Sequence, residues 1–211
     1  MTQCVELHSA AMAPATHLLL SWLVANATPG CSAPERRRER FVITAAGLAP
    51  DIDGLGLVAG LMTGSWDRAQ MWFSEYHHLL HNGLMAAGVA IVAGLWCRSV
   101  TVGIACLVAF HLHLLCDVVG AKGPDGYPWP IPYGLPFTSD WGWIWSGQWA
   151  LNAWPNTVIT AVALVTSMWL AHRRGYWFLD LFNRHYDRRV LALLRLHAGQ
   201  VEPAPAASDQ R

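Results

Sequence analysis

The sequence predicts an all-α membrane protein: a multi-pass helical bundle of about four to five membrane helices, with an irregular Trp- and Pro-rich outer loop. Three observations carry this prediction. Charged residues make up 13% of the chain, well below the roughly 25% that is typical of a soluble globular domain. Several apolar runs approach the roughly 20 residues that cross about 30 Å of hydrocarbon. The basic residues gather in segments that would lie on one side of a membrane.

Five apolar runs are the candidate membrane segments. They are residues 10–28, 41–64, 79–97, 99–118 and 155–171. Within the second run, Asp51 and Asp53 are the only charged residues. A soluble, all-helical core is the alternative interpretation, because several of these runs are short or interrupted.

The distribution of basic residues favours the membrane interpretation. If residues 29–40 are cytoplasmic and the chain crosses at each run, every Lys and Arg except Arg68 and Lys122 lies on the inner side, as the positive-inside rule requires. This topology predicts an inner-membrane protein with residues 119–154 on the outer side. The stretch LLLSWLVANA ends like a signal-peptide cleavage site, but no Lys or Arg precedes it, so we expect the first run to be retained.

The remaining segments are an outer loop and a basic C-terminal part. Prolines and glycines in residues 119–154 exclude a long helix there. Tryptophans of this loop suit either the aromatic belt of a membrane or a packed cap over the bundle. They are Trp129, Trp141, Trp143, Trp145, Trp149 and Trp154. We expect a membrane domain over residues 1–172, a basic amphipathic surface helix over 173–197 and a disordered tail over 198–211.

Histidines and aspartates converge on one side of this predicted membrane domain. With the topology above, all the candidates fall in the outer half of the membrane or just beyond it. They are His17, Asp51, Asp53, His77, His81, His113 and Asp117, with His78 and His111 in possible supporting roles. Ionisable groups within membrane segments are costly, so each of them calls for a functional explanation.

The spacing of the histidines is that of metal ligands. On a helix, residues i and i+4 share a face, so His77 pairs with His81, and His113 pairs with Asp117. His111 points about 200° away from His113, so we expect only His113 to be a direct ligand.

The paired carboxylates point to the same chemistry. Asp51 and Asp53 follow Pro50, and two carboxylates so close together repel unless a cation neutralises them. Mixed imidazole and carboxylate ligands suit zinc, which we favour, or manganese, and this many groups could hold two or more ions. A single membrane histidine usually makes a helix–helix hydrogen bond, and a single Asp is usually a helix cap. The combination on one side favours a divalent-metal site.

Several motifs together resemble a known family. They are THLLL, LAPDID, YHHLLHN, HLLCD and the stretch GPDGYPWPIPYGLPF–WSGQWALNAWPN. From about Thr16 to Asn156 the chain resembles the LexA-regulated inner-membrane metal-dependent hydrolases, often called YdjM-like. Members commonly show HR…HS where this sequence has HHLLHN, so His78 takes the place of the arginine. The family is grouped more distantly with zinc-dependent phospholipase C, and this kinship implies a phosphoester-type hydrolase.

Hydrolysis is therefore the leading functional hypothesis. A metal-activated water would attack phosphorus or a carbonyl, with Asp51 or Asp53 as catalytic residue and His17 completing the coordination. The expected partners are the bilayer and a phosphoester or phospholipid-type substrate. Nucleic acid is not expected, because the net charge is zero. The alternatives are a non-catalytic metal-binding or transport protein and a haem protein with paired axial histidines.

The arginine distribution generates a prediction about orientation. A cysteine placed at Asp125 should react with an impermeant thiol reagent in intact spheroplasts, because the positive-inside rule puts residues 119–154 on the outer side. A cysteine placed at Arg36 serves as the control and should react only after lysis. The reverse pattern of labelling would contradict the orientation.

Overall fold

Helices make up the structure, which confirms the all-helical prediction. The computed structural model describes residues 14–54, 62–65, 79–122 and 126–197, with the backbone alone for 53, 54 and 195–197. No strand forms in these residues, where the β-structure consists of two isolated bridges, Lys122–Ala150 and Ile131–Trp143. Both bridges lie in the predicted outer loop, so its irregular character is confirmed.

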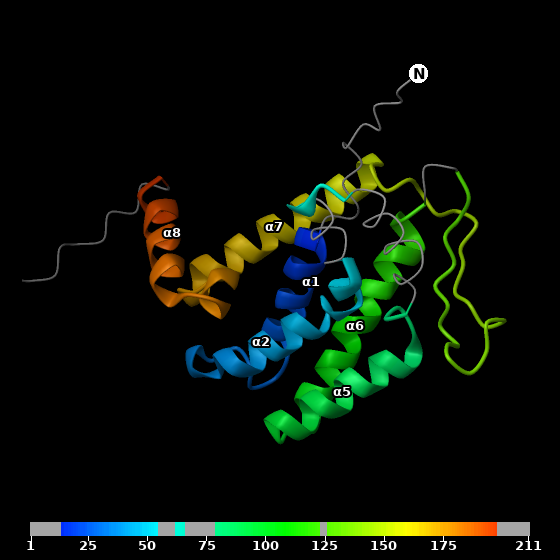
Figure 1. The fold of residues 1–211 in the computed structure, drawn as a ribbon. Helices are drawn as coiled ribbons and strands as arrows, with labels where there is room; N and C mark the ends of the chain where they lie inside the picture. The colour runs from blue at the N-terminus through cyan, green and yellow to red at the C-terminus, as the bar shows by residue number, and fades with distance from the viewer. Residues whose placement is uncertain (1–13, 55–61, 66–78, 123–125, 198–211) are drawn as a thin grey trace, which may run out of the picture.

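The helices follow one another along the chain in the order shown in Figure 1. They are α1 (Pro14–Ala27), α2 (Arg37–Ala46), α5 (Gly83–Cys97), α6 (Val100–Gly120), α7 (Trp154–Arg174) and α8 (Arg184–His197). Three short 3-10 turns lie between them: η1 (Pro34–Arg36), η2 (Ala49–Gly54) and η3 (Phe178–Leu181).

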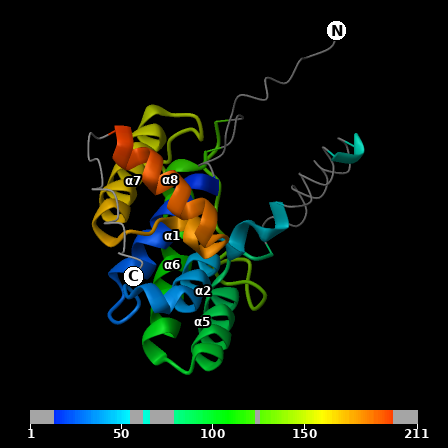
Figure 2. The same ribbon diagram turned by 90° about the vertical axis from the view of Figure 1, so that its left-hand side faces the viewer.

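Helix α6 is the centre of the bundle. It packs against α1, α2, α5 and η2, and Figures 1 and 2 show these elements around it. Its small side chains meet α2 and α5 in one apolar cluster that includes Ile43, Ala93 and Cys106. Further along the helix, Phe110 and Leu114 pack with Ile131 of the loop. Between membrane helices, close van der Waals packing of this kind is one of the main forces that hold the bundle together.

The α5–α6 hairpin has clear local causes in the sequence. Asn82 begins α5, and its side chain accepts a hydrogen bond from the Met85 amide at 2.9 Å. Ser99 begins α6 in the same way, through the Val102 amide. Gly94 and Gly103 let the two helices approach closely, because a Cβ atom on Gly94 would lie 3.4 Å from the Cα of Gly103.

The number of spanning helices differs from the prediction. Among the described residues, α6 and α7 are long and apolar enough to cross a membrane, at 21 residues each, against the four or five expected. Helix α5 is apolar but shorter, with 15 residues. The expected run 41–64 is interrupted, because α2 ends at Ala46. The chain continues through Gly47 into η2, which contains Pro50.

A buried ion pair fastens the arginine-rich end of the bundle. Arg40 of α2 is fully buried and donates to Asp180 of η3 at 3.0 Å. The Arg40 guanidinium also donates to the carbonyls of Cys31 and Ala33 and lies over the Tyr176 ring, 4.1 Å from its centroid. This network connects the α1–α2 turn with the segment that follows α7.

Removing one partner of this pair should destabilise the protein strongly. Asp180→Ala should lower the free energy of unfolding by about 3–5 kcal/mol, because the Arg40 charge stays buried without its carboxylate. Thermal unfolding of the detergent-purified variant measures this. Glu39→Ala is the matched control, because it removes the partner of Arg36, whose side chain is 57% exposed, and it should change stability little. Equal effects would contradict the proposed role of the pair.

Candidate metal centre

The site is built on the C-terminal half of α6. His113 and Asp117 lie one turn apart on the same face of this helix, and both are buried. His113 Nε2 lies 3.1 Å from Asp117 Oδ2. The i, i+4 spacing therefore places an imidazole and a carboxylate side by side inside the bundle.

Two more histidines reach the same carboxylate from other elements. His17 comes from the first turn of α1, and its Nε2 lies 3.5 Å from Asp117 Oδ1. His81 directly precedes the residue that caps α5, and its Nε2 lies 3.5 Å from Asp117 Oδ2. The rings of His17 and His113 are stacked, with centroids 3.8 Å apart. Three imidazoles thus surround one buried carboxylate.

The α2–η2 turn orients His113 and adds a second carboxylate. His113 Nδ1 lies 2.8 Å from the carbonyl oxygen of Gly47, and because a carbonyl only accepts, Nδ1 must carry the proton. A neutral His113 therefore turns the lone pair of Nε2 inward. Asp51 of η2 places Oδ1 3.5 Å from that nitrogen. The side chain of Asp51 is 27% exposed, so Asp51 is the most exposed member of the cluster.

These positions fit a divalent cation. Within the described residues, the buried His113 Nε2 has no hydrogen-bond partner, although carboxylate oxygens of Asp117 and Asp51 lie 3.1 and 3.5 Å away. A lone pair that faces two carboxylates is repulsive unless a proton or a metal ion lies between them. Two ligands of a tetrahedral zinc ion, with bonds of about 2.0–2.2 Å, lie about 3.4 Å apart. The observed separations match this spacing.

The ligands form two overlapping groups, each of which could hold a metal ion. One group consists of His17, Asp51 and His113, and the other of His81, His113 and Asp117. Their ligand atoms lie within 4.8 Å of one another. His113 belongs to both groups, but its Nε2 can bind one ion, since Nδ1 is engaged by Gly47. A second ion would therefore depend on a bridging carboxylate.

The structure separates His111 from this cluster. His111 Nδ1 donates to the Leu107 carbonyl, and its Nε2 lies 2.9 Å from the hydroxyl of Tyr133 in the outer loop. His111 therefore connects α6 to the loop. His77 and His78 lie outside the described residues, as does the side chain of Asp53.

One buried residue that sequence reasoning missed supports the site from the outer loop. Gln148 donates through Nε2 to the carbonyl of Asp117 at 2.8 Å, and its Oε1 accepts from the Trp129 amide at 2.6 Å. The Trp129 ring in turn lies near His81, with centroids 6.2 Å apart. The only signal in the sequence was a lone amide among tryptophans in WSGQW.

Across the part of the chain that the structure describes, the fold and this cluster define an all-helical protein with two helices that could cross a membrane and with His and Asp groups that could hold a metal ion. The chain belongs to the YdjM inner membrane protein family, whose family model matches residues 12–179. This match confirms the resemblance to the YdjM-like inner membrane proteins and agrees with the apolar helices. No curated protein and no solved structure was found to match the chain.

The different surroundings of His113 and His111 generate a prediction. His113→Ala should lower metal affinity by at least about tenfold, because even residues that merely orient a ligand contribute this much. His111→Ala should keep nearly the wild-type affinity, since that ring faces Tyr133. Zinc titration of the purified variants, with circular dichroism as a check of folding, measures both. Equal retention of metal would show that His113 serves only in helix packing.

Proposed function

We propose that this protein is a membrane-bound, metal-dependent hydrolase that cleaves a phosphoester or phospholipid-type substrate. The observation that carries the proposal is the convergence of three imidazole nitrogens and two carboxylates, of which only Asp51 is partly exposed. Zinc is the favoured ion, because neutral imidazoles together with carboxylates suit it, and manganese is the alternative.

The cluster consists of buried side chains and one partly exposed carboxylate, that of Asp51. Asp117, His81 and His113 are buried and would hold the ion. A bound divalent cation would stabilise negative charge on a phosphoryl or carbonyl oxygen and would lower the pKa of water towards 7. Asp51 is partly exposed, and its carboxylate would accept the proton of the attacking water as general base. The side chain of Asp53, the other catalytic candidate, would act from the same turn.

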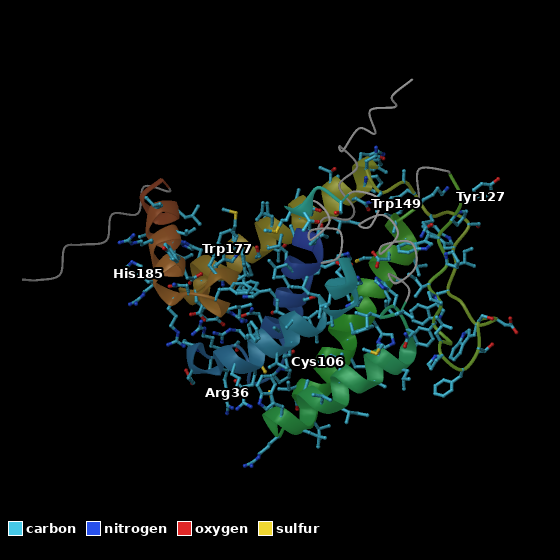
Figure 3. The ribbon with its side chains drawn as sticks, in the orientation of Figure 1. Arg36, Cys106, Tyr127, Trp149, Trp177 and His185 are labelled. Carbon is cyan, nitrogen blue, oxygen red and sulfur yellow. The ribbon has the colours of Figure 1, made fainter. Side chains whose placement is uncertain are left out.

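The placement of charges supports a site that faces the outer side of the membrane. Figure 3 shows Arg36 and His185 at one end of the bundle, and Tyr127 and Trp149 at the other. The cluster belongs to the loop end, because Gln148 bonds to the Asp117 carbonyl. With the arginine-rich end on the inner side, as the positive-inside rule favours, the site would lie at the depth of outer-leaflet headgroups. A lipid phosphodiester is the substrate class found at this depth.

Metal binding without hydrolysis is the second candidate function. A transport or metal-binding protein would use the same ligands, and ionisable groups within membrane segments often mark ion paths. The candidate ligands in the described residues gather at one end of α6, whereas the buried Arg40–Asp180 ion pair lies at the other end of the bundle. This arrangement favours a local site over a path through the protein.

Hydrolysis by matched aspartate variants tests the proposal. Asp51→Asn should keep the fold but lower the hydrolysis of bis-para-nitrophenyl phosphate and phosphatidylglycerol about a hundredfold or more, since it removes the general base. Asp140→Asn, at an exposed loop position, is the control and should retain activity. Chelation should abolish the wild-type activity, and zinc or manganese should restore it. A folded, metal-loaded wild type that hydrolyses neither compound would overturn the hydrolase proposal, and metal uptake would then favour transport.

A further inference from the structure

An apolar groove of about 540 Å³ lies on the exposed face of the α5–α6 hairpin. Its apolar walls are formed by Ala90, Ile91, Leu95, Val100, Ile104 and Leu107. Gly94 and Gly103 form its floor, because neither residue has a side chain to fill the space between the two helices. None of these residues belongs to the metal cluster. The groove is therefore a separate feature of the hairpin.

One end of this groove is positively charged. Arg98 and Ser99 line the groove where α5 turns into α6, and Arg98 is exposed. In the described part of the chain, no carboxylate lies within ion-pair distance of Arg98. The first amides of α6 have no acceptor within the helix apart from the Ser99 cap, and they add a partial positive charge at the same place.

The charged end of the groove also carries the features of a membrane interface. Trp96 is 60% exposed beside this turn, and the Arg38 guanidinium lies 4.9 Å from the centroid of its ring. Tryptophan and arginine are the residues that gather at headgroup depth on the inner side. The groove then continues along α6 from Val100 to Leu107, which corresponds to about 12 Å at 1.5 Å per residue. It is thus cationic at the interface and apolar towards the hydrocarbon.

We propose that this groove binds an anionic phospholipid. One acyl chain lies between α5 and α6 along the glycine floor, and the phosphate lies at Arg98 and the start of α6. The apolar walls accept the chain of any phospholipid, so the Arg98 charge supplies the preference for an anionic headgroup. The walls of the groove carry no charge, whereas its interface end carries Arg98 and, beside it, Arg38. This contrast favours an anionic lipid over a second protein copy, which would bring its own arginines to the same place.

Native mass spectrometry of the full-length protein tests the charge preference. The protein is titrated with equal amounts of phosphatidylglycerol and phosphatidylcholine, and the ratio of the two bound lipids is measured. The wild type should prefer phosphatidylglycerol, and Arg98→Gln should lower this preference about tenfold, because it removes a charge-assisted contact to phosphate. Arg188→Gln, an exposed arginine on α8, is the matched control and should keep the preference.

A second pair of variants tests the place of the acyl chain. Ile104→Trp should fill the groove and reduce the binding of both lipids, whereas Val108→Trp, at a 51% exposed position outside the groove, should not. Equal binding of the two lipids by the wild type would overturn the proposal, as would an unchanged preference in Arg98→Gln. A dimer that Ile104→Trp dissociates would show instead that a second copy covers the groove.

Discussion

The carboxylate of Asp117 is buried within the central helix of the bundle, and a negative charge in that position must be balanced. Three imidazoles from α1, from the start of α5 and from α6 itself supply the surroundings that allow it. The stacking of His17 on His113 requires α1 to lie against α6 at this level. The contact of His113 with the Gly47 carbonyl likewise fixes the end of α2. The positions of α1, α2 and α5 at this end are thus tied to the contacts that surround the Asp117 carboxylate.

The two ends of the bundle solve the problem of buried charge differently. At the arginine-rich end, Arg40 and Asp180 neutralise one another directly, and the backbone carbonyls of Cys31 and Ala33 accept hydrogen bonds from Nη1 of Arg40. At the other end, the partners of Asp51 and Asp117 among the described residues are imidazoles, which are neutral near pH 7 unless they gain a proton or face a cation. The first arrangement balances its charges with protein groups. The second contains His and Asp groups that could hold a metal ion, which would supply the balancing charge.

Much of the fold and part of the site followed from the sequence, for physical reasons. The apolar runs predicted α5, α6 and α7, and the i, i+4 spacing of His113 and Asp117 placed them on one face, since helical periodicity is a local property. The break after α2 was underestimated, because one Gly and one Pro in an apolar run do not show where a helix ends. The role of Gln148 was hidden, because its partners are backbone atoms that the fold alone brings near. Long-range hydrogen bonds leave no periodic trace in a sequence.

Gln148 also couples the ordering of the outer loop to the occupancy of the site. Its amide joins the carbonyl of Asp117 to both backbone groups of Trp129, so the loop and the end of α6 share one hydrogen-bonded unit. Thermodynamic linkage is reciprocal. An ion that rigidifies Asp117 would order the loop and protect it from proteolysis. Disorder of the loop would in turn weaken the binding of the ion by the same coupling free energy. The order of the loop would therefore report on ion binding inside the bundle.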